Sequence, residues 1–378
     1  MKKSFTVLLL LLLLTASGCQ KNPTPPTPPS PDPAKPTTAV RGMWVPASDS
    51  DALTSRENIQ RMVDECASYG VNHLFIVAWT RGFTSYPSPL MQQLFNVGND
   101  PRFAGRDPMK EVIEIAHKKN IKVYAWFEYG FAADFGAANA HILTQKPTWA
   151  ARSANGSITT KNGFRWMNSL KPEVQNFMID LIKEAVTTYD LDGIQGDDRL
   201  PAMPAEAGYD AETVALYQQE NNGSTPPANM KDLAWVSWRA TKLTDFLGRL
   251  KTAVKTIKPN CQISMSPSVF PFSRDEYLQD WPEWLKKGHV DMICPQIYRR
   301  DLPGYQNELN KVLTSQITAS QKTLLVPGLL LRAAPYVASD TLLNAQVNAN
   351  RQAGLPGEIF FHYEGTRTRK AFFEKIYK

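Results

Sequence analysis

Short apolar segments alternate with amphipathic segments along most of this chain, and this alternation constrains its fold more than any other feature. The pattern occurs eight times between Arg41 and the C-terminus, and each apolar run precedes a stretch with apolar residues at helical spacing. Several runs, such as 71–79 and 323–331, are nearly continuous in apolar residues, which is typical of strands buried on both faces. Eight strand–helix pairs predict an α/β fold, a parallel (β/α)₈ or TIM barrel.

The links between the predicted elements are unequal in length. Links from helix to strand are short, whereas two links from strand to helix are long, 130–170 and 200–234. Long loops in a barrel are uncommon unless they are functional, and the loops that follow the strands build the active face. We therefore expect a site at the C-terminal face. The predicted strands lie at 41–46, 71–79, 121–130, 192–198, 262–268, 290–298, 323–331 and 357–365. The predicted helices lie at 55–69, 109–119, 172–188, 238–257, 281–287, 306–320, 341–353 and 369–377.

The first residues of the chain have the pattern of a secretory signal. Lys2 and Lys3 precede an apolar run, Phe5–Leu14, and small residues then lead to Cys19. The run is shorter than the roughly 20 residues that span a bilayer, so we expect a signal peptide over 1–18. The sequence ASGC resembles a bacterial lipobox, in which Cys19 becomes the lipidated N-terminus. An ordinary cleaved signal is the alternative.

A proline-rich stretch follows the proposed lipidation site. Eight prolines lie between Asn22 and Pro36, so we expect residues 19–38 to form an extended spacer. Residues 39–378 then form the barrel as one domain. Such a chain is expected in the bacterial cell envelope, attached to a membrane through its N-terminal lipid, with the barrel outside the cytoplasm.

Composition excludes several other classes of protein. The net charge is +6, but the basic residues are scattered, which argues against a nucleic-acid partner. Cys66, Cys261 and Cys294 lie in apolar contexts without a paired spacing, so we expect buried thiols. The five histidines never occur at metal-ligand spacing, and we expect neither a metal nor a cofactor. No oligomeric state is predicted.

The sequence LDGIQGDDRL, at 191–200, places two adjacent carboxylates at the end of the fourth predicted strand. Because residues alternate in direction along a strand, Gln195 and Asp197 are expected to face the barrel axis and Asp198 the opposite side. An inward carboxylate at the rim is suited to act as nucleophile or charge stabiliser at an oxocarbenium ion. The alternative for Asp198, and less so for Asp197, is an ion pair with Arg199 or a cap on the next turn.

A glycosidase also needs a carboxylic acid that donates a proton to the leaving oxygen. The third strand ends AWFEYG, which places Glu128 on the rim among aromatic residues. Apolar surroundings raise a carboxyl pKa, as a general acid requires. Glu364, in FFHYEG at the end of the eighth strand, is the rival, and we rank Glu128 first. Either glutamate could instead bind a sugar hydroxyl or pair with an arginine.

Other residues predicted near the strand ends are of the kinds that bind sugars. Aromatic faces stack on pyranose rings, while amides and guanidinium groups bind hydroxyls. Individually, each aromatic residue is more readily explained by core or rim packing, and it is their grouping at strand ends that indicates a binding site. The candidates for substrate binding are Arg41, Trp44, Trp79, Trp126, Tyr129, Trp166, Asn168, Gln296, Tyr298, Arg332 and His362.

Five of these segments together carry a family resemblance. RGMWVP, AWFEYG, YDLDGIQGDD, VDMICPQIY and GEIFFHYEG resemble the glycosyl hydrolase-like family ten, from about Val40 to the C-terminus. The resemblance implies a barrel fold, glycosidase activity, a bacterial lipoprotein, and functional aspartates at Asp197 and Asp198. Gly196 and Arg199 stand where many members have aromatic residues. Some members act on the glycan strands of peptidoglycan, which makes a glycan the expected partner.

Two other functions were weighed against a glycosidase. A non-catalytic glycan-binding lipoprotein would keep the aromatic residues but would not need the carboxylates. A phosphate-handling barrel would need a glycine-rich loop after the seventh strand, where LLLRAAP offers none.

Overall fold

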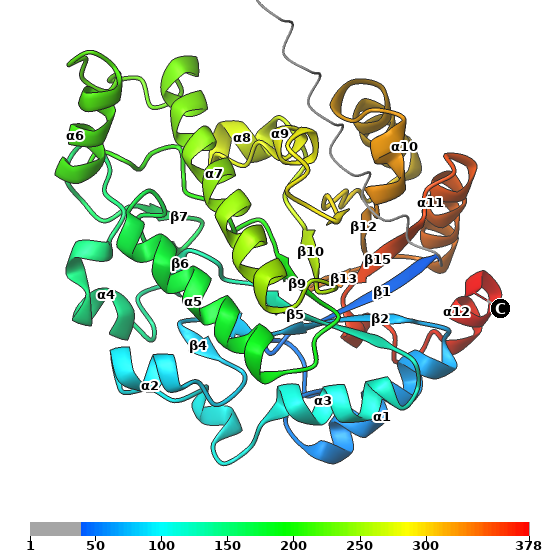
Figure 1. Cartoon of the computed structure of the whole chain (residues 1–378). Coiled ribbons are helices and arrows are strands. Elements are labelled where there is room, and N and C mark those ends of the chain that lie inside the picture. Colours follow the sequence, from blue (N-terminus) through cyan, green and yellow to red (C-terminus); the bar gives the residue numbers. More distant parts are fainter. Residues whose placement is uncertain (1–38, 378) are drawn as a thin grey trace, which may run out of the picture. The chain divides into compact units, whose positions relative to one another are not determined.

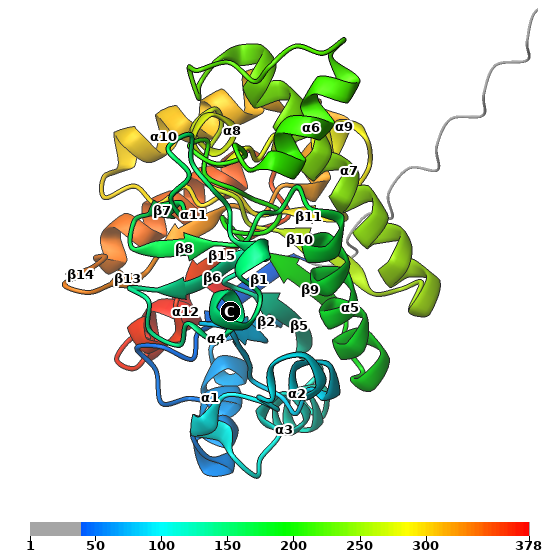
Figure 2. The ribbon, with the colours of Figure 1, turned by 90° about the vertical axis from the view of Figure 1, so that its left-hand side faces the viewer.

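The computed structural model describes residues 39–377, in which helices surround a curved sheet of eight parallel strands (Figures 1 and 2). The expected signal peptide, Cys19 and the proline-rich spacer lie outside the described residues. The strands of the sheet are β1 (Val40–Val45), β2 (His73–Val77), β5 (Lys122–Phe127), β9 (Gly193–Gly196), β10 (Gln262–Met265), β11 (Met292–Ile293), β12 (Gly328–Leu330) and β15 (Gly357–Phe361). The expected TIM-barrel architecture is therefore confirmed.

The strands neighbour one another in the order β11-β10-β9-β5-β2-β1-β15-β12, which is chain order around a barrel. Between β11 and β12 the connection consists of isolated parallel bridges, Ile293 with Leu325 and Gln296 with Gly328. The two predicted strands in this region are longer than the observed ones. Pro295 and Pro327 explain the difference, because proline has no backbone N–H to donate to a ladder.

Eight of the helices correspond to the predicted ones, but α7 (Leu233–Ile257) begins five residues before its prediction, and α10 (Leu302–Lys311) ends at Lys311, where a π-helix continues to Gln316. Polar side chains begin several of them; Ser55, for example, accepts a hydrogen bond from the backbone N of Asn58 at 3.1 Å. Within residues 39–377, no helix combines the length and the apolarity needed to cross a membrane. These helices are α1 (Arg56–Ser68), α3 (Pro108–His117), α5 (Pro172–Thr188), α7 (Leu233–Ile257), α9 (Trp281–Lys286), α10 (Leu302–Lys311), α11 (Asp340–Gln352) and α12 (Lys370–Tyr377).

The long loops after the strands contain structure of their own. The loop after β5 forms a small antiparallel sheet in the order β6-β8-β7 (Figure 2). The loop after β9 is held by Arg239 of α7, which is fully buried. Arg239 donates to the backbone carbonyls of Ala205 and Ala207 at 2.6 Å and of Met230 at 2.7 Å, all three in that loop. These additional elements are β3 (Trp79–Thr80), β4 (Phe83–Thr84), β6 (Ala132–Phe135), β7 (Thr160–Lys161), β8 (Phe164–Trp166), β13 (Arg332–Ala333), β14 (Tyr336–Val337), α2 (Pro89–Phe95), α4 (His141–Gln145), α6 (Ala211–Glu220) and α8 (Phe272–Tyr277).

The barrel interior is filled by large side chains and by three side chains that are joined in series by hydrogen bonds. The Trp44 ring lies 5.9 Å from Phe75, and Phe75 lies 4.7 Å from Tyr124, so neighbouring strands pack ring against ring. Trp44 Nε1 donates to Gln195 Oε1 at 2.6 Å, and Gln195 Nε2 donates to Ser264 Oγ at 2.9 Å. These two hydrogen bonds join β1, β9 and β10 directly beneath the C-terminal face. The three cysteines are buried and free, as expected.

Candidate active site

A cavity of about 130 Å³ lies at the C-terminal ends of the strands. Its walls come from β1, β5 and β15 and from the residues that follow β5, β9, β10 and β11. A cavity with both polar and aromatic walls therefore lies at the face of the barrel where the site was expected. The residues that line it are Trp44, Trp126, Glu128, Asp197, Asp198, Arg199, Ser266, Gln296, Tyr298 and Phe361.

Both aspartates of the central motif line this cavity. The strand ends at Gly196, and a turn follows in which the Leu200 N–H donates to the Asp197 carbonyl at 3.1 Å. The expectation that Asp198 faces away is wrong, because strand alternation no longer applies beyond Gly196. Asp197 is 2% exposed, whereas 28% of the Asp198 side chain is exposed. Asp198 is therefore the aspartate that a ligand reaches more easily.

Arg199 holds the aspartate pair in place. Its backbone N donates to Asp197 Oδ1 at 3.0 Å, and its Nη2 donates to Asp197 Oδ2 at 3.1 Å. Its Nη1 lies 3.0 Å from Asp198 Oδ1. The ion pairs with Arg199, considered as an alternative to catalytic roles, are thus present, and they occur inside the cavity. One guanidinium group serves two carboxylates here.

Glu128 lies beside this group because the backbone approaches closely at Gly130. A Cβ atom on Gly130 would lie 2.1 Å from the Arg199 carbonyl oxygen, and Gly130 has a φ of +47°. Only glycine permits this approach, in which the Phe131 N–H donates to the same carbonyl at 2.9 Å. The Arg199 Nε in turn donates to the Glu128 carbonyl at 2.9 Å. These contacts join the end of β5 to the turn after β9.

The three carboxyl groups differ in their contacts with positive charge. Burial raises the pKa of Glu128, and Asp198 adds to this effect while Arg199 opposes it. Burial also raises the pKa of Asp197, and the two Arg199 contacts oppose that rise. Both aspartates contact the guanidinium group, whereas the Glu128 carboxyl does not. Protonation of Glu128 therefore breaks no ion pair with Arg199, whereas protonation of either aspartate does, and this contact geometry favours Glu128 as the proton donor.

Two buried polar atoms in this wall have no partner among the described residues. They are Glu128 Oε2 and Trp126 Nε1. Trp126 belongs to β5 and Glu128 follows the last residue of that strand, and both side chains line the same cavity. Buried polar atoms are nearly always hydrogen-bonded, so an unpaired donor and an unpaired carboxyl oxygen in one cavity favour a polar ligand.

Aromatic rings form the opposite part of the cavity. The Phe361 ring lies 6.0 Å from Trp44, 6.4 Å from Trp126 and 5.6 Å from Tyr298. Burial raises the pKa of Tyr298, and the charges of Asp198 and Asp197 act in the same direction, so its hydroxyl stays neutral. Gln296 Nε2 donates to the Ser266 carbonyl at 3.0 Å. Trp44, Trp126, Gln296 and Tyr298 are thus substrate-binding candidates that the structure brings together.

Glu364, the rival acid, is held by other residues. Its Oε1 accepts from Ser50 Oγ at 2.8 Å, and Arg367 Nε lies 2.6 Å from its Oε2. Its side chain is 7% exposed and does not line the cavity. Its contacts are those of a structural residue: an ion pair with Arg367 beyond β15 and a hydrogen bond from Ser50 in the loop after β1.

Arg41 lies at the other end of the barrel, so its assignment to the rim needs correction. It is the second residue of β1, three positions before Trp44, which is about 10 Å along a strand. Its guanidinium lies 5.6 Å from the Tyr377 ring, and its Nε donates to the Gly70 carbonyl. It lines a separate hollow with Glu358 and Arg351. The error came from treating the whole first strand as rim.

Four further candidates support the loops and do not line the cavity. Trp79 is fully buried and donates from Nε1 to the Gly130 carbonyl at 2.9 Å. Asn168 is fully buried and donates to Thr213 Oγ1 at 3.0 Å. Trp166 is buried with its ring 5.9 Å from Tyr277. The Tyr129 ring lies 5.6 Å from the Arg199 guanidinium, so Tyr129 contacts a residue of the site without lining the cavity.

Arg332 and His362 form a separate group with Asp49. The Arg332 guanidinium lies 3.5 Å from Asp49 Oδ1, and His362 Nε2 lies 3.7 Å from Asp49 Oδ2. Burial lowers the pKa of His362. The group stands on the rim beside Phe361 but does not line the cavity.

The sequence did not identify three of the lining residues as ligand contacts. Arg199 was considered only as a partner of the aspartates, and Ser266 and Phe361 were not singled out. Phe361 immediately precedes His362, and Ser266 directly follows β10, so their positions at strand ends were the available signal.

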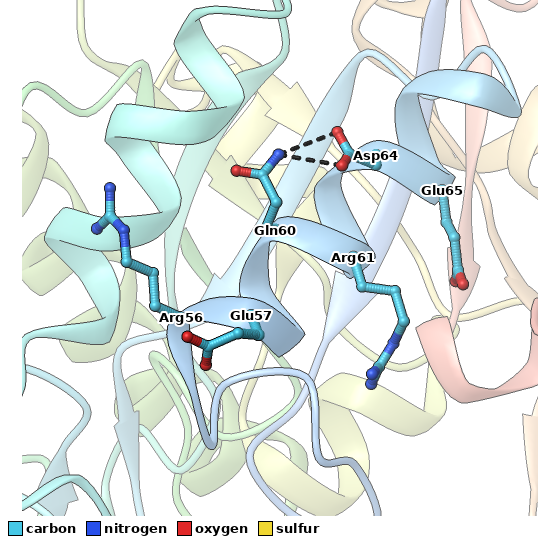
Figure 3. A pocket seen from close by; sticks show the side chains of 6 residues that line it. All are labelled: Arg56, Glu57, Gln60, Arg61, Asp64 and Glu65. Atoms are coloured by element: carbon cyan, nitrogen blue, oxygen red, sulfur yellow. Dashed lines mark hydrogen bonds between the residues drawn. The ribbon is translucent and has the colours of Figure 1, made fainter.

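Metal-ligand groups and a hollow along α1 were two other possible sites among residues 39–377, and neither forms a rival to this cavity. Residues 39–377 contain no group of three or more His, Cys, Asp or Glu side chains arranged to hold a metal ion. Another hollow lies along α1, but all the side chains that line it come from that one helix, and Gln60 donates to Asp64 at 3.1 Å (Figure 3). A single solvent-facing helix encloses no ligand, so the cavity at the strand ends is the stronger candidate.

Comparison of sequences gives a family and two named relatives. The family model described as Glycosyl hydrolase-like 10 matches residues 39–337. Glycosyl hydrolase DigH from Escherichia coli (strain K12) is 26% identical over 293 residues, which cover 69% of this chain and 64% of DigH. Glycosyl hydrolase YngK from Bacillus subtilis (strain 168) is 24% identical over 280 residues, covering 68% of this chain and 51% of YngK. The matches thus cover roughly half to two thirds of these relatives.

Two solved structures with a similar architecture are a glycoside hydrolase domain and a β-amylase domain. The glycoside hydrolase domain of PgaB (BpsB) from Bordetella bronchiseptica has a TM-score of 0.65 at 14% identity, covering 90% of this chain and 99% of that domain. The catalytic domain of β-amylase from Paenibacillus polymyxa has a TM-score of 0.59 at 9% identity, covering 90% and 98%. At these identities, the likeness shows the fold.

Proposed function

This chain belongs to the glycosyl hydrolase-like 10 family, and from that premise we propose that it hydrolyses glycosidic bonds of a polysaccharide in the cavity at the strand ends. The observation that carries the proposal is the unpaired, buried Glu128 oxygen in the same cavity as two aspartates held by one arginine. Fold alone supports no activity, whereas an uncommitted acid beside fixed carboxylates is the pair that glycoside hydrolysis requires.

In the proposed reaction, Glu128 is the general acid and base. Its proton passes to the glycosidic oxygen as the bond from that oxygen to the anomeric carbon breaks. Asp197 acts as nucleophile or charge stabiliser at the positive anomeric carbon. Water then supplies the hydroxyl group to that carbon and returns a proton to Glu128; where Asp197 has formed a bond to the carbon, this attack breaks that bond and restores the carboxylate. Arg199 opposes the rise in the Asp197 pKa and so favours its ionised form, and Asp198 adds negative charge at the same position.

The aromatic and amide residues of the cavity are proposed to orient the sugar. Trp44, Trp126 and Phe361 offer ring faces to a pyranose, and Trp126 Nε1 offers an unpaired donor to a hydroxyl group. Gln296 and Tyr298 complete this side. These contacts would hold the anomeric carbon over the aspartates.

We propose peptidoglycan glycan strands as the substrate and the cell envelope as the location. The support is the signal-like N-terminus, Cys19 and the proline-rich spacer, which together suit a barrel that works beside the cell wall. Replacement of Cys19 by alanine should release the protein from membranes on cell fractionation. A variant that remains membrane-bound would contradict the lipid anchor.

The test of activity uses purified sacculi and a panel of polysaccharides with the barrel, residues 39–378. The wild type should release reducing ends from at least one of them. Glu128→Gln and Asp197→Asn should each lower kcat by about 10²–10⁴-fold while glycan binding is retained. As a matched control, Glu212→Gln removes a carboxylate whose side chain is 70% exposed, and it should retain activity.

The second candidate function is glycan binding without turnover. It is supported by the aromatic cavity wall, which needs no carboxylate to bind a sugar. Wild-type protein that binds a glycan without releasing reducing ends, and whose Asp197→Asn and Glu128→Gln variants bind equally well, would establish this function instead.

A further inference from the structure

A row of aromatic rings leads from the cavity to the surface of the loop after β5. The Arg199 guanidinium lies 5.0 Å from the centre of the Phe164 ring, and the Phe135 ring lies 5.1 Å beyond Phe164. Tyr129 lies 5.3 Å from Phe164 and 5.6 Å from the guanidinium. We call Tyr129, Phe164 and Phe135 the aromatic row. It begins at the residue that holds the catalytic carboxylates.

The two outer rings stand on the ribbon of β6 and β8, neighbouring strands of the small three-stranded sheet. In the register of β6 and β8, Phe135 lies opposite Phe164 and Asp134 lies opposite Arg165. Because side chains alternate along a strand, the two phenylalanines share one face and the ion pair occupies the other. Arg165 donates to both carboxyl oxygens of Asp134, at 2.8 and 2.7 Å.

The buried side of this ribbon fixes its exposed side. Asp134 is 1% exposed, and the two parallel hydrogen bonds set the relative position of the strands. The ring pair is therefore held in place before any ligand arrives, which lowers the entropic cost of binding.

Phe135 is unusual because 52% of it remains exposed although its ring is fixed. It rests on Gly163, where a Cβ atom would lie 2.5 Å from the ring. A half-exposed ring contributes little to the core, so core packing does not account for a phenylalanine at this position. A fixed, half-exposed ring next to a sugar-binding cavity has the properties of a stacking platform for the apolar face of a pyranose.

We propose that Phe135 and Phe164 form a remote subsite for a further sugar residue of the same glycan chain whose scissile bond lies in the cavity. This inference rests on the proposed function and extends it to the form of the substrate. A monosaccharide glycoside in the cavity does not reach Phe135, which lies one ring beyond the residue that contacts Arg199. The subsite therefore selects chains over short glycosides.

The test compares three substitutions of Phe135 on chitin oligosaccharides from disaccharide to hexasaccharide. Phe135→Ala should raise KM for the hexasaccharide about tenfold, leave kcat unchanged, and leave the disaccharide unaffected. Phe135→Trp, which keeps a ring face, should retain the wild-type KM. Phe135→Leu, which keeps apolar bulk without a planar face, should behave as Phe135→Ala does.

A matched control separates this role from general loss of apolar surface. Leu233→Ala removes a side chain that is 73% exposed at the start of α7, and it should leave all kinetic constants unchanged. Equal effects of Phe135→Ala on disaccharide and hexasaccharide, or no effect on either, would overturn the subsite.

Failure of the proposed activity is distinguishable from failure of the subsite. If the wild type cleaves none of the oligosaccharides, the affinities of the wild type and of Phe135→Ala for the same series are measured by calorimetry. Tighter binding of the hexasaccharide than of the disaccharide, lost in Phe135→Ala, supports the subsite without turnover. Equal affinities for all lengths, or no binding at all, overturn it.

Discussion

The Arg199 Nε donates to the backbone carbonyl of Glu128 at 2.9 Å, which joins the turn after β9 to the end of β5. The same guanidinium contacts Asp197 and Asp198. The position of the proposed acid relative to the proposed nucleophile therefore depends on one side chain with three simultaneous contacts.

Replacement of this residue, Arg199→Lys, should lower kcat by about 10²-fold, because an ammonium group is a point charge and cannot reproduce the planar set of contacts. Weaker support for the Asp197 carboxylate raises its pKa further, so the acid limb of the kcat/KM profile should move to higher pH. Arg274→Lys, at a half-exposed pair with Asp275, is the control and should leave the profile unchanged. An unchanged acid limb in Arg199→Lys would contradict the role given to this residue.

The alkaline limb of the same profile should belong to Glu128. Burial raises the pKa of Glu128, and a general acid must be protonated, so kcat/KM should fall as pH rises through that raised pKa. The limb should therefore lie above the ordinary glutamate value of about 4.3. In Glu128→Gln, an activated aryl glycoside needs no proton donor, and its residual hydrolysis should lack the alkaline limb. Persistence of that limb would assign it to another group.

Glu128 should also lower the stability of the fold near neutral pH. A carboxyl group whose folded-state pKa is raised favours the folded state below its unfolded pKa, and this contribution is lost as pH rises through the folded value. Glu128→Gln has no such loss, so its Tm should exceed that of the wild type at neutral pH and approach it in acid. Thermal unfolding at several pH values measures this difference, and Glu212→Gln should show no such trend.

Glu364→Gln should retain activity within about threefold, since its carboxylate pairs with Arg367 and Ser50 outside the cavity. It should lose about 1 kcal/mol of unfolding free energy, because Arg367 is 44% exposed and solvent screens the pair. Denaturant titration gives the second value. Loss of activity comparable to that of Glu128→Gln would restore Glu364 as the acid.

Arg239→Met should destabilise the protein by about 3 kcal/mol, because the carbonyls of Ala205, Ala207 and Met230 would lose a buried donor. The midpoint of denaturant unfolding should fall while the slope is unchanged. Trp238→Met, on the same helix but with a partly exposed ring, should cost less. Equal costs would show that packing of the side chain, rather than its donors, stabilises the loop.

The fold could be predicted from the sequence because its signals are periodic and repeated. The predicted helix over 172–188 coincides with α5, and the strand at 121–130 contains β5, since both patterns extend over many residues. The strand at 290–298 was predicted too long because Pro295, a single residue, interrupts the ladder. The aromatic ribbon of β6 and β8 was not predicted, since each of its strands is too short to give a periodic pattern.

The candidate site could be predicted only as a set of strand ends. Glu128 and Asp197 were identified because each follows an apolar strand. The direction of Asp198 was predicted wrongly because it depends on where β9 stops, which no residue in LDGIQGDDRL marks. The close approach of Gly130 to Arg199 joins segments nearly 70 positions apart, so it could not be derived from local pattern.

The barrel wall between β11 and β12 is joined by isolated bridges, whereas the ladders of β1 with β2 and of β2 with β5 are continuous. Fewer hydrogen bonds must break for this seam to separate, so its amides should exchange with solvent before those of the β2 region. Gln296 and Tyr298 stand directly beside the seam. The side of the cavity that carries Gln296 and Tyr298 should therefore yield more readily than the side that carries the carboxylates.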